Sequence, residues 1–281
     1  MQQSRFIVKI KFFFYLLLIA LPIFTYANTL NNSSQLNPLT SLSNVRVSMQ
    51  RMLQSTDDQY FLSLFAGVAN PKATLTILGN SDLIKLKGTQ KGNDLSLNAD
   101  TTTQSEIEVL KQITGVLDSN TGVFQTKVLI DDNWQNIQFE PAFKVENKPL
   151  FTFKFYGVKA DTQAREQLLT RVDVINKTTK KVAQTLTGFS AFPNSIGYMD
   201  INFDGHYDVI LSDLSQDRKL EDKRFIYWIY NPKTQQFQRS PQLEKVVGFP
   251  NLHGEKQQID FGNGQLFQVK NGLLNQITFD E

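Results

Sequence analysis

Apolar and polar residues alternate through the stretch ATLTILGNSDLIKLKGTQKGNDLSLNA, residues 73–99. The alternating pairs are Leu75 and Ile77, Ile84 and Leu86, and Leu95 and Leu97. A period of two places every second side chain on one face of a strand, so each pair indicates a half-buried β-strand. Two turn clusters, residues 79–82 (GNSD) and 91–94 (KGND), separate the pairs at a spacing that suits hairpins. The stretch therefore predicts antiparallel strands joined by tight turns.

The same alternation continues toward residue 145 and predicts a first domain of β-strands. Further alternating pairs are Ile107 and Val109, Val128 and Ile130, and Ile137 and Phe139. Residues 45–54, VRVSMQRMLQ, are an exception, because their period is ambiguous at this length, and we predict a short helix there. We expect residues 45–145 to form an N-terminal β-meander domain.

A second series of strands begins after the proline- and asparagine-containing residues 140–149. Phe151, Phe153 and Phe155 share one strand face. Residues 225–230, FIYWIY, are continuously apolar and aromatic, as in a buried strand that ends before Pro232. We place a second β domain at residues 146–281. The expected fold class is therefore all-β with minor helix, in two small antiparallel domains.

The N-terminal residues have the pattern of a secretory signal peptide. Arg5, Lys9 and Lys11 precede an apolar run over residues 12–24, and residues 25–27 (TYA) carry small residues at both cleavage-determining positions. The competing interpretation is a membrane anchor, but the run is shorter than the roughly 20 residues that span a bilayer. We predict a signal peptide at residues 1–27, a polar linker at 28–44, and a mature protein that is periplasmic or secreted and not membrane-spanning.

Cysteine content and charge exclude several functions. The chain has no cysteine, which excludes disulfides, lipidation at a cysteine and thiolate metal sites. Removing the three basic residues of the predicted signal peptide from 29 leaves 26 basic residues against 27 acidic ones. A near-neutral chain without a basic cluster lacks the positive surface that nucleic-acid binding needs, so we expect no nucleic-acid partner.

One motif points to metal chemistry. Residues 200–208 read DINFDGHYD and follow the spacing D-x-N-x-D-G-x-x-D. Alternate oxygen-bearing side chains in a tight loop can converge on a hard cation, and glycine at the sixth position allows the sharp turn. We predict a calcium site in which the side chains of Asp200, Asn202, Asp204 and Asp208 donate oxygens and His206 donates its backbone carbonyl.

The motif departs from an EF-hand loop at its twelfth position, which is Leu211 where that loop has a bidentate glutamate. We therefore expect a loop between two strands and weaker calcium binding, with Asp213 as a further candidate ligand. The alternative is an Asp- and Asn-rich turn that binds no ion, since these residues favour turns anyway.

The sequence contains no recognisable catalytic constellation. One of its two histidines lies inside the loop and the other, His253, stands beside a glycine, and neither H-E-x-x-H nor G-x-S-x-G occurs. Glu106 with Glu108, or Glu221 with Asp222, could form a carboxylate pair, but acids this close in sequence usually share a solvated face. We expect that the protein is not an enzyme.

Three segments carry a resemblance to a known family: residues 172–176 with 181–184, the loop 200–208, and residues 227–232 with Phe237, Ser240 and Leu243. In order and spacing they resemble the calcium-loop family of periplasmic lysozyme-inhibitor-like proteins, which includes immunity proteins against peptidoglycan hydrolases delivered by type IV secretion systems. The resemblance implies an all-β domain that holds one calcium ion and blocks a lysozyme by presenting a loop to its active-site cleft.

The resemblance also implies a set of inhibitory contacts. Relatives among the I-type lysozyme inhibitors use a Ser-Gly-x-Tyr loop, and the nearest counterpart here is residues 195–198, SIGY, with the glycine displaced by one. The implied partner-binding residues are Ser195, Gly197 and Tyr198. Two hypotheses follow: an immunity-type periplasmic inhibitor of a lysozyme or other peptidoglycan hydrolase, or a non-catalytic structural or surface calcium-binding protein of the envelope.

Overall fold

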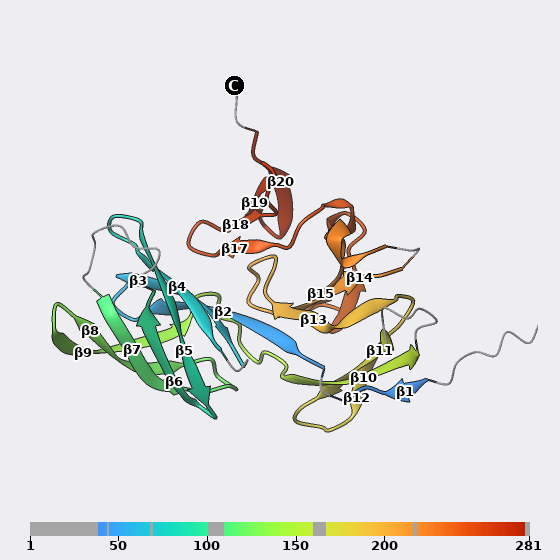
Figure 1. The fold of residues 1–281 in the computed structure, drawn as a ribbon, viewed down its shortest axis with the longest axis horizontal. Helices are drawn as coiled ribbons and strands as arrows, with labels where there is room; N and C mark the ends of the chain where they lie inside the picture. The colour runs from blue at the N-terminus through green and yellow to red at the C-terminus, as the bar shows by residue number, and fades with distance from the viewer. Residues whose placement is uncertain are drawn as a thin grey trace, which may run out of the picture. The chain divides into compact units, whose positions relative to one another are not determined.

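The computed structural model describes residues 39–43, 45–67, 70–100, 110–159, 167–215 and 218–278. The predicted signal peptide, most of the predicted linker, the pair Ile107 and Val109, and the acids Glu106 and Glu108 lie outside the described residues. Within the described ranges the regular secondary structure is almost entirely β-strand, with two three-residue 3-10 helices at Leu220–Asp222 and Leu243–Lys245 (Figure 1). The all-β prediction is confirmed at this level.

Eight consecutive strands form a closed antiparallel barrel. They are β2 (Val47–Ser55), β3 (Tyr60–Ala66), β4 (Lys72–Ile77), β5 (Asp82–Lys91), β6 (Asp94–Ala99), β7 (Leu110–Leu117), β8 (Phe124–Ile130) and β9 (Asn133–Pro141). The ring closes because β9 pairs back onto β2, with Leu53 opposite Pro141 and Ser55 opposite Phe139. Alternate residues point inward, as the period of two predicts, and form one apolar core that includes Leu75, Leu97 and Phe124.

The predicted helix at residues 45–54 is wrong, because this segment is strand β2. Its residues Gln50 to Leu53 are all buried in succession. Leu53 belongs to the barrel core, whereas Met52 belongs to a separate cluster outside the barrel. A strand that is covered on both faces loses the alternation that marks a half-buried strand, and pairing with neighbours overrides helix propensity.

A second set of strands continues from the barrel through β2. It contains β1 (Thr40–Ser41), β10 (Phe151–Lys159), β11 (Gln167–Asn176), β12 (Val182–Leu186), β13 (Ala191–Met199), β14 (Asp208–Asp213), β15 (Phe225–Asn231) and β16 (Gln236–Arg239). Strand β13 pairs antiparallel with β14 and parallel with β2, where Tyr198 lies opposite Met49. Figure 1 shows β1 in blue and the later strands of this set in yellow-green to orange. They enclose a second apolar core that includes Val172, Leu211 and Ile226.

The last four strands form a separate antiparallel sheet: β17 (Asn251–His253), β18 (Gln258–Asp260), β19 (Leu266–Lys270) and β20 (Leu273–Gln276). Its Ile259 and Phe261 join a third apolar cluster with Met52 and Phe61 of the barrel strands. At Gly254 a Cβ atom would lie 2.5 Å from the ring of Phe61, so only glycine allows this close approach.

Residues 37–281 form one compact unit. The predicted division into two β domains is therefore not confirmed, and the boundary near residue 145 stays a prediction. No helix within the described ranges is long and apolar enough to span a membrane.

Candidate functional site

The predicted metal loop connects two neighbouring strands. Strand β13 ends at Met199 and strand β14 begins at Asp208, so the two strands hold both ends of the loop in antiparallel register. Phe203 and Gly205 have positive φ angles of 56° and 85°, which turn the chain sharply. The ring of Phe203 packs on Phe143, with 5.3 Å between the centroids. The prediction of a loop between strands is confirmed.

The two most buried acids of the loop bind backbone N–H groups. Asp200 is 3% exposed, and its two carboxylate oxygens accept hydrogen bonds from the backbone N–H of Asp204 at 3.0 Å and of Gly205 at 2.8 Å. Asp208 is 0% exposed and accepts from the N–H of Ile201 at 2.9 Å and of Tyr230 at 2.8 Å. Asp208 therefore joins the start of the loop to strand β15.

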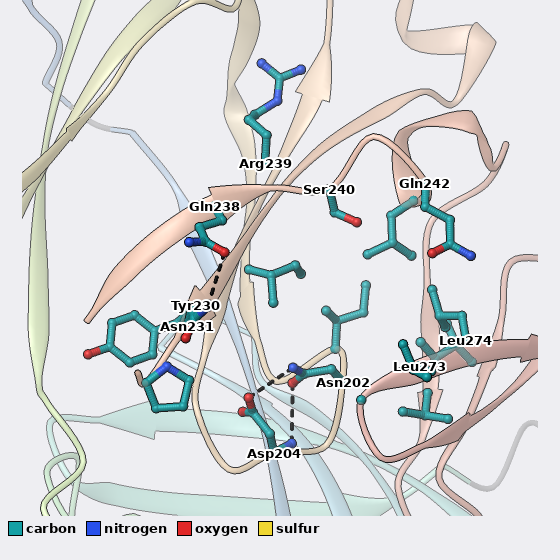
Figure 2. Close-up of a pocket in the computed structure, with 17 residues that line it drawn as sticks. Asn202, Asp204, Tyr230, Asn231, Gln238, Arg239, Ser240, Gln242, Leu273 and Leu274 are labelled. Carbon is teal, nitrogen blue, oxygen red and sulfur yellow. Dashed lines mark hydrogen bonds between the residues drawn. The ribbon is translucent and has the colours of Figure 1, made fainter. Parts of the chain in front are cut away.

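Asn202 and Asp204 form the open side of the loop. Their side chains are linked by a hydrogen bond of 3.0 Å from the amide nitrogen of Asn202 to a carboxylate oxygen of Asp204 (Figure 2). The other oxygen of Asp204 accepts from the backbone N–H of His206 at 2.8 Å, and its side chain is 29% exposed. Both residues line a cavity of about 360 Å³, together with Gln238 and Gln242.

The buried acids are electrostatically unfavourable in the absence of a cation. Burial, reinforced by repulsion from Asp204, raises the pKa of Asp200 to about 7. Burial and repulsion from Asp200 raise the pKa of Asp208 well above its usual range. Within the described part of the chain, no lysine or arginine forms an ion pair with these carboxylates. A cation in the loop would offset this excess of negative charge.

The loop fits a hard cation in its donor chemistry and charge. Its side chains offer oxygen atoms, which calcium prefers. The imidazole of His206 stacks on Tyr230 at 5.1 Å between centroids, and its Nδ1 atom lies 3.3 Å from a carboxylate oxygen of Asp204. Nevertheless, no three His, Cys, Asp or Glu side chains among the described residues are grouped as a metal site requires. Calcium binding by Asp200, Asn202, Asp204, His206 and Asp208 therefore stays a prediction.

Asp213, the further candidate ligand, lies at the other end of β14 from the loop. Its carboxylate accepts hydrogen bonds from Ser215 and forms an ion pair with Arg218. This carboxylate is therefore satisfied by its own neighbours and not by the loop.

The candidate partner-binding residues lie in a strand and not in a loop. Ser195, Gly197 and Tyr198 belong to β13, where residues 196–198 pair with both β14 and β2. Tyr198 is 8% exposed and packs edge-on against Phe153 at 5.0 Å between centroids. Residues 196–198 are thus held by strand pairing on both sides, and their role in partner binding stays a prediction.

The remaining acid and histidine candidates are not brought together. His253 is on β17, with 42% of its side chain exposed and 3.9 Å from Glu255. Glu221 and Asp222 lie exposed on a 3-10 helix. Sequence analysis missed Lys148 and Arg51, two cationic residues near the loop, because each stands alone without a motif.

Comparisons with known proteins give no family for this chain. No family model matches it, and no curated protein matches it. Among solved structures, the chain is similar to the WD40 domain of Toxoplasma gondii coronin, at 9% identity over 85% of this chain and 74% of that one, with a TM-score of 0.26. A similarity this weak carries no argument about fold or function.

Proposed function

We propose that the protein is a non-enzymatic calcium-binding protein of the periplasm that inhibits a lysozyme or another peptidoglycan hydrolase. The observation that supports it most is the pair of buried carboxylates, Asp200 and Asp208, whose pKa values are raised in a loop of oxygen donors. The partner class is supported by the resemblance of residues 172–243 to periplasmic lysozyme-inhibitor-like proteins.

Bound calcium would supply positive charge to the loop and restrict its motion. The chain's own residues do the rest: Asp208 holds the loop against β15, and Phe203 and Gly205 hold it against residues 143–145. The partly exposed edge at Asn202 and Asp204 then presents a fixed surface to a partner. A preordered surface binds with a smaller loss of conformational entropy than a mobile one.

The test is a peptidoglycan-clearing assay with lysozymes of several classes and the mature protein, in calcium and in chelator. We expect inhibition of at least one lysozyme in calcium, weakened about tenfold or more in chelator. Asp204→Asn should weaken the inhibition in calcium, whereas Asp94→Asn, an exposed acid of β6 far along the barrel, should not. Absence of inhibition at high micromolar protein, with an intact fold, contradicts the inhibitor proposal.

A second candidate is a structural calcium-binding protein of the envelope. It is favoured by the contacts of Asp208, which tie the loop to β15 rather than to an exposed surface. In that case calorimetry detects calcium binding and calcium raises the melting temperature, but no lysozyme is inhibited. Asp204→Asn then lowers only the melting temperature.

A further inference from the structure

A second cavity, of about 480 Å³, lies apart from the one in Figure 2. Its wall is formed by strand β2, the turn between β7 and β8, and the segment between β9 and β10. Part of the wall is apolar, from Met49, Leu150 and Phe151. The volume lies in the range of small-molecule sites, roughly 300 to 1,000 Å³.

Arg51 faces this cavity as a largely buried cation. It is 6% exposed, and no described residue accepts a hydrogen bond from its guanidinium or forms an ion pair with it. The phenols of Tyr198 and Tyr207 line the same cavity. A buried guanidinium has five N–H donors, and leaving them without acceptors is costly. Strand β2 holds Arg51 in place, because it is paired with β3 at this position.

Lys148 adds a second positive charge to the same cavity. Its Nζ atom lies 3.5 Å from the centroid of the Tyr207 ring, a cation–π contact that fixes the ammonium group. Lys148 and Arg51 are close enough for Arg51 to contribute to lowering the pKa of Lys148, which burial brings to about 8. Two positive charges on the wall of one cavity favour the binding of an anion there.

The other charged groups of the wall already have partners. Glu140 is paired with Lys144 at 2.6 Å, and Lys177 donates from its Nζ atom to the side chain of Asn120. The acids Asp200, Asp204 and Asp208 act on Lys148 electrostatically but form no ion pair with it in the described structure. Arg51 and Lys148 are thus the charges of this wall that are available to a ligand.

We propose that this cavity binds a small organic molecule through an oxyanion group, a carboxylate or a phosphate. The guanidinium of Arg51 matches the two oxygens of such a group, and Lys148 adds a point charge. The apolar wall then covers the body of the molecule. The argument for this site uses neither calcium binding nor lysozyme inhibition.

The test is calorimetric titration of the mature protein with benzoate, phenyl phosphate and the uncharged analogue benzyl alcohol, in chelator. We expect at least one anion to bind about tenfold or more tightly than benzyl alcohol, and to weaken as salt is raised. Tighter binding of benzoate identifies a carboxylate ligand, and tighter binding of phenyl phosphate identifies a phosphate ligand. The proposal is wrong if neither anion binds at millimolar concentration, or if the uncharged analogue binds equally well.

Two variants locate the site. Arg51→Gln and Lys148→Gln should each weaken binding of the anion about tenfold or more, whereas Lys85→Gln, an exposed lysine of β5, should leave it unchanged. Circular dichroism establishes which variants are folded. If Arg51→Gln does not fold, Lys148→Gln decides the question, because its residue lies in a connecting segment outside the strands. Unchanged anion binding in a folded Lys148→Gln variant overturns the proposal.

Discussion

Asp208 uses both carboxylate oxygens for backbone N–H groups while it is 0% exposed. An acid in this position gains hydrogen bonds but loses hydration, and the raised pKa shows that the loss of hydration dominates. The loop spacing predicted the connection between β13 and β14, because a turn depends on local chain geometry, whereas the set of calcium ligands stays a prediction. Lys148 and Arg51 could not be predicted, because long-range strand pairing and packing bring them to their sites.

The raised pKa values predict how stability depends on pH without calcium. Between about pH 4 and 7 the folded protein binds more protons at Asp200 and Asp208 than the unfolded chain does, so the free energy of unfolding falls as pH rises. In chelator, we expect a loss of more than about 1 kcal/mol from pH 5 to 7.5, since one pKa unit corresponds to about 1.4 kcal/mol. Urea unfolding at each pH measures it.

Asp200→Asn serves as the control for this pH dependence. The variant loses one acceptor oxygen and is less stable at pH 5. Its free energy of unfolding should, however, fall less between pH 5 and 7.5 than that of the unaltered chain. Saturating calcium should also reduce the fall, because it favours the charged carboxylates. If the free energy of unfolding falls equally with pH in the variant and in the unaltered chain, both in chelator, then Asp200 is not the source of the pH dependence.

Gly205 is predicted to be indispensable for packing as well as for its backbone angle. A Cβ atom there would lie 2.3 Å from a methyl group of Val145, at a φ of 85°. Gly205→Ala should lower the free energy of unfolding by about 2–4 kcal/mol. Gly188→Ala is a matched control, since Gly188 has a φ of 79° but no atom within 4 Å of its Cβ position. That variant should cost only about 1 kcal/mol. Equal losses would show that the contact with Val145 is unimportant.

At the scale of strands, the alternation of residues was a good guide wherever one face is solvated. It identified β4, β5, β6, β8 and β9. It missed β7, where the buried Leu110, Ile113 and Leu117 are spaced by three and four residues. A bulge between Leu110 and Gln112 produces the spacing of three residues. The spacing of four arises because the alternate position between Ile113 and Leu117 is Gly115, which has no side chain.

Strands β12 and β16 are joined by a side chain in place of a backbone ladder. The amide of Gln184 donates to the backbone carbonyl of Phe237 at 2.8 Å and accepts from its N–H at 2.7 Å. Gln184→Ala should lower the free energy of unfolding by about 1–2 kcal/mol, because two hydrogen bonds are lost. Gln236→Ala, at an exposed position of β16, should change it by less than about 0.5 kcal/mol. Equal effects in the two variants would contradict a bridging role for Gln184.

At the scale of the whole described chain, β2 belongs to the barrel and to the second set of strands alike. Periodicity along the sequence could not indicate this sharing, because the partners of β2 lie as far along the chain as Tyr198. Residues 140–149 do carry the composition of a boundary, and the strands do change partners there. Composition could not show that β2, an earlier strand, pairs with strands on both sides of this boundary.

The shared strand predicts a single cooperative unfolding transition. The two tryptophans report on different strands, since Trp134 lies in barrel strand β9 and Trp228 in β15. The variants Trp134→Phe and Trp228→Phe each keep one tryptophan. In each variant, the urea midpoint measured by tryptophan fluorescence should therefore equal the midpoint measured by circular dichroism. A fluorescence midpoint that differs from the circular-dichroism midpoint in either variant would favour the two-domain prediction.

The place of β2 in the sequence, ahead of β9 and β13, also has a consequence for biosynthesis. Ribosomes release residues 47–55 long before residues 133–141 and 196–198, which must pair with them. Until then one edge of β2 is unpaired, since β3 covers only the other edge, and an unpaired edge invites association with other nascent chains. The slowest folding step is therefore expected to be ring closure between these distant segments.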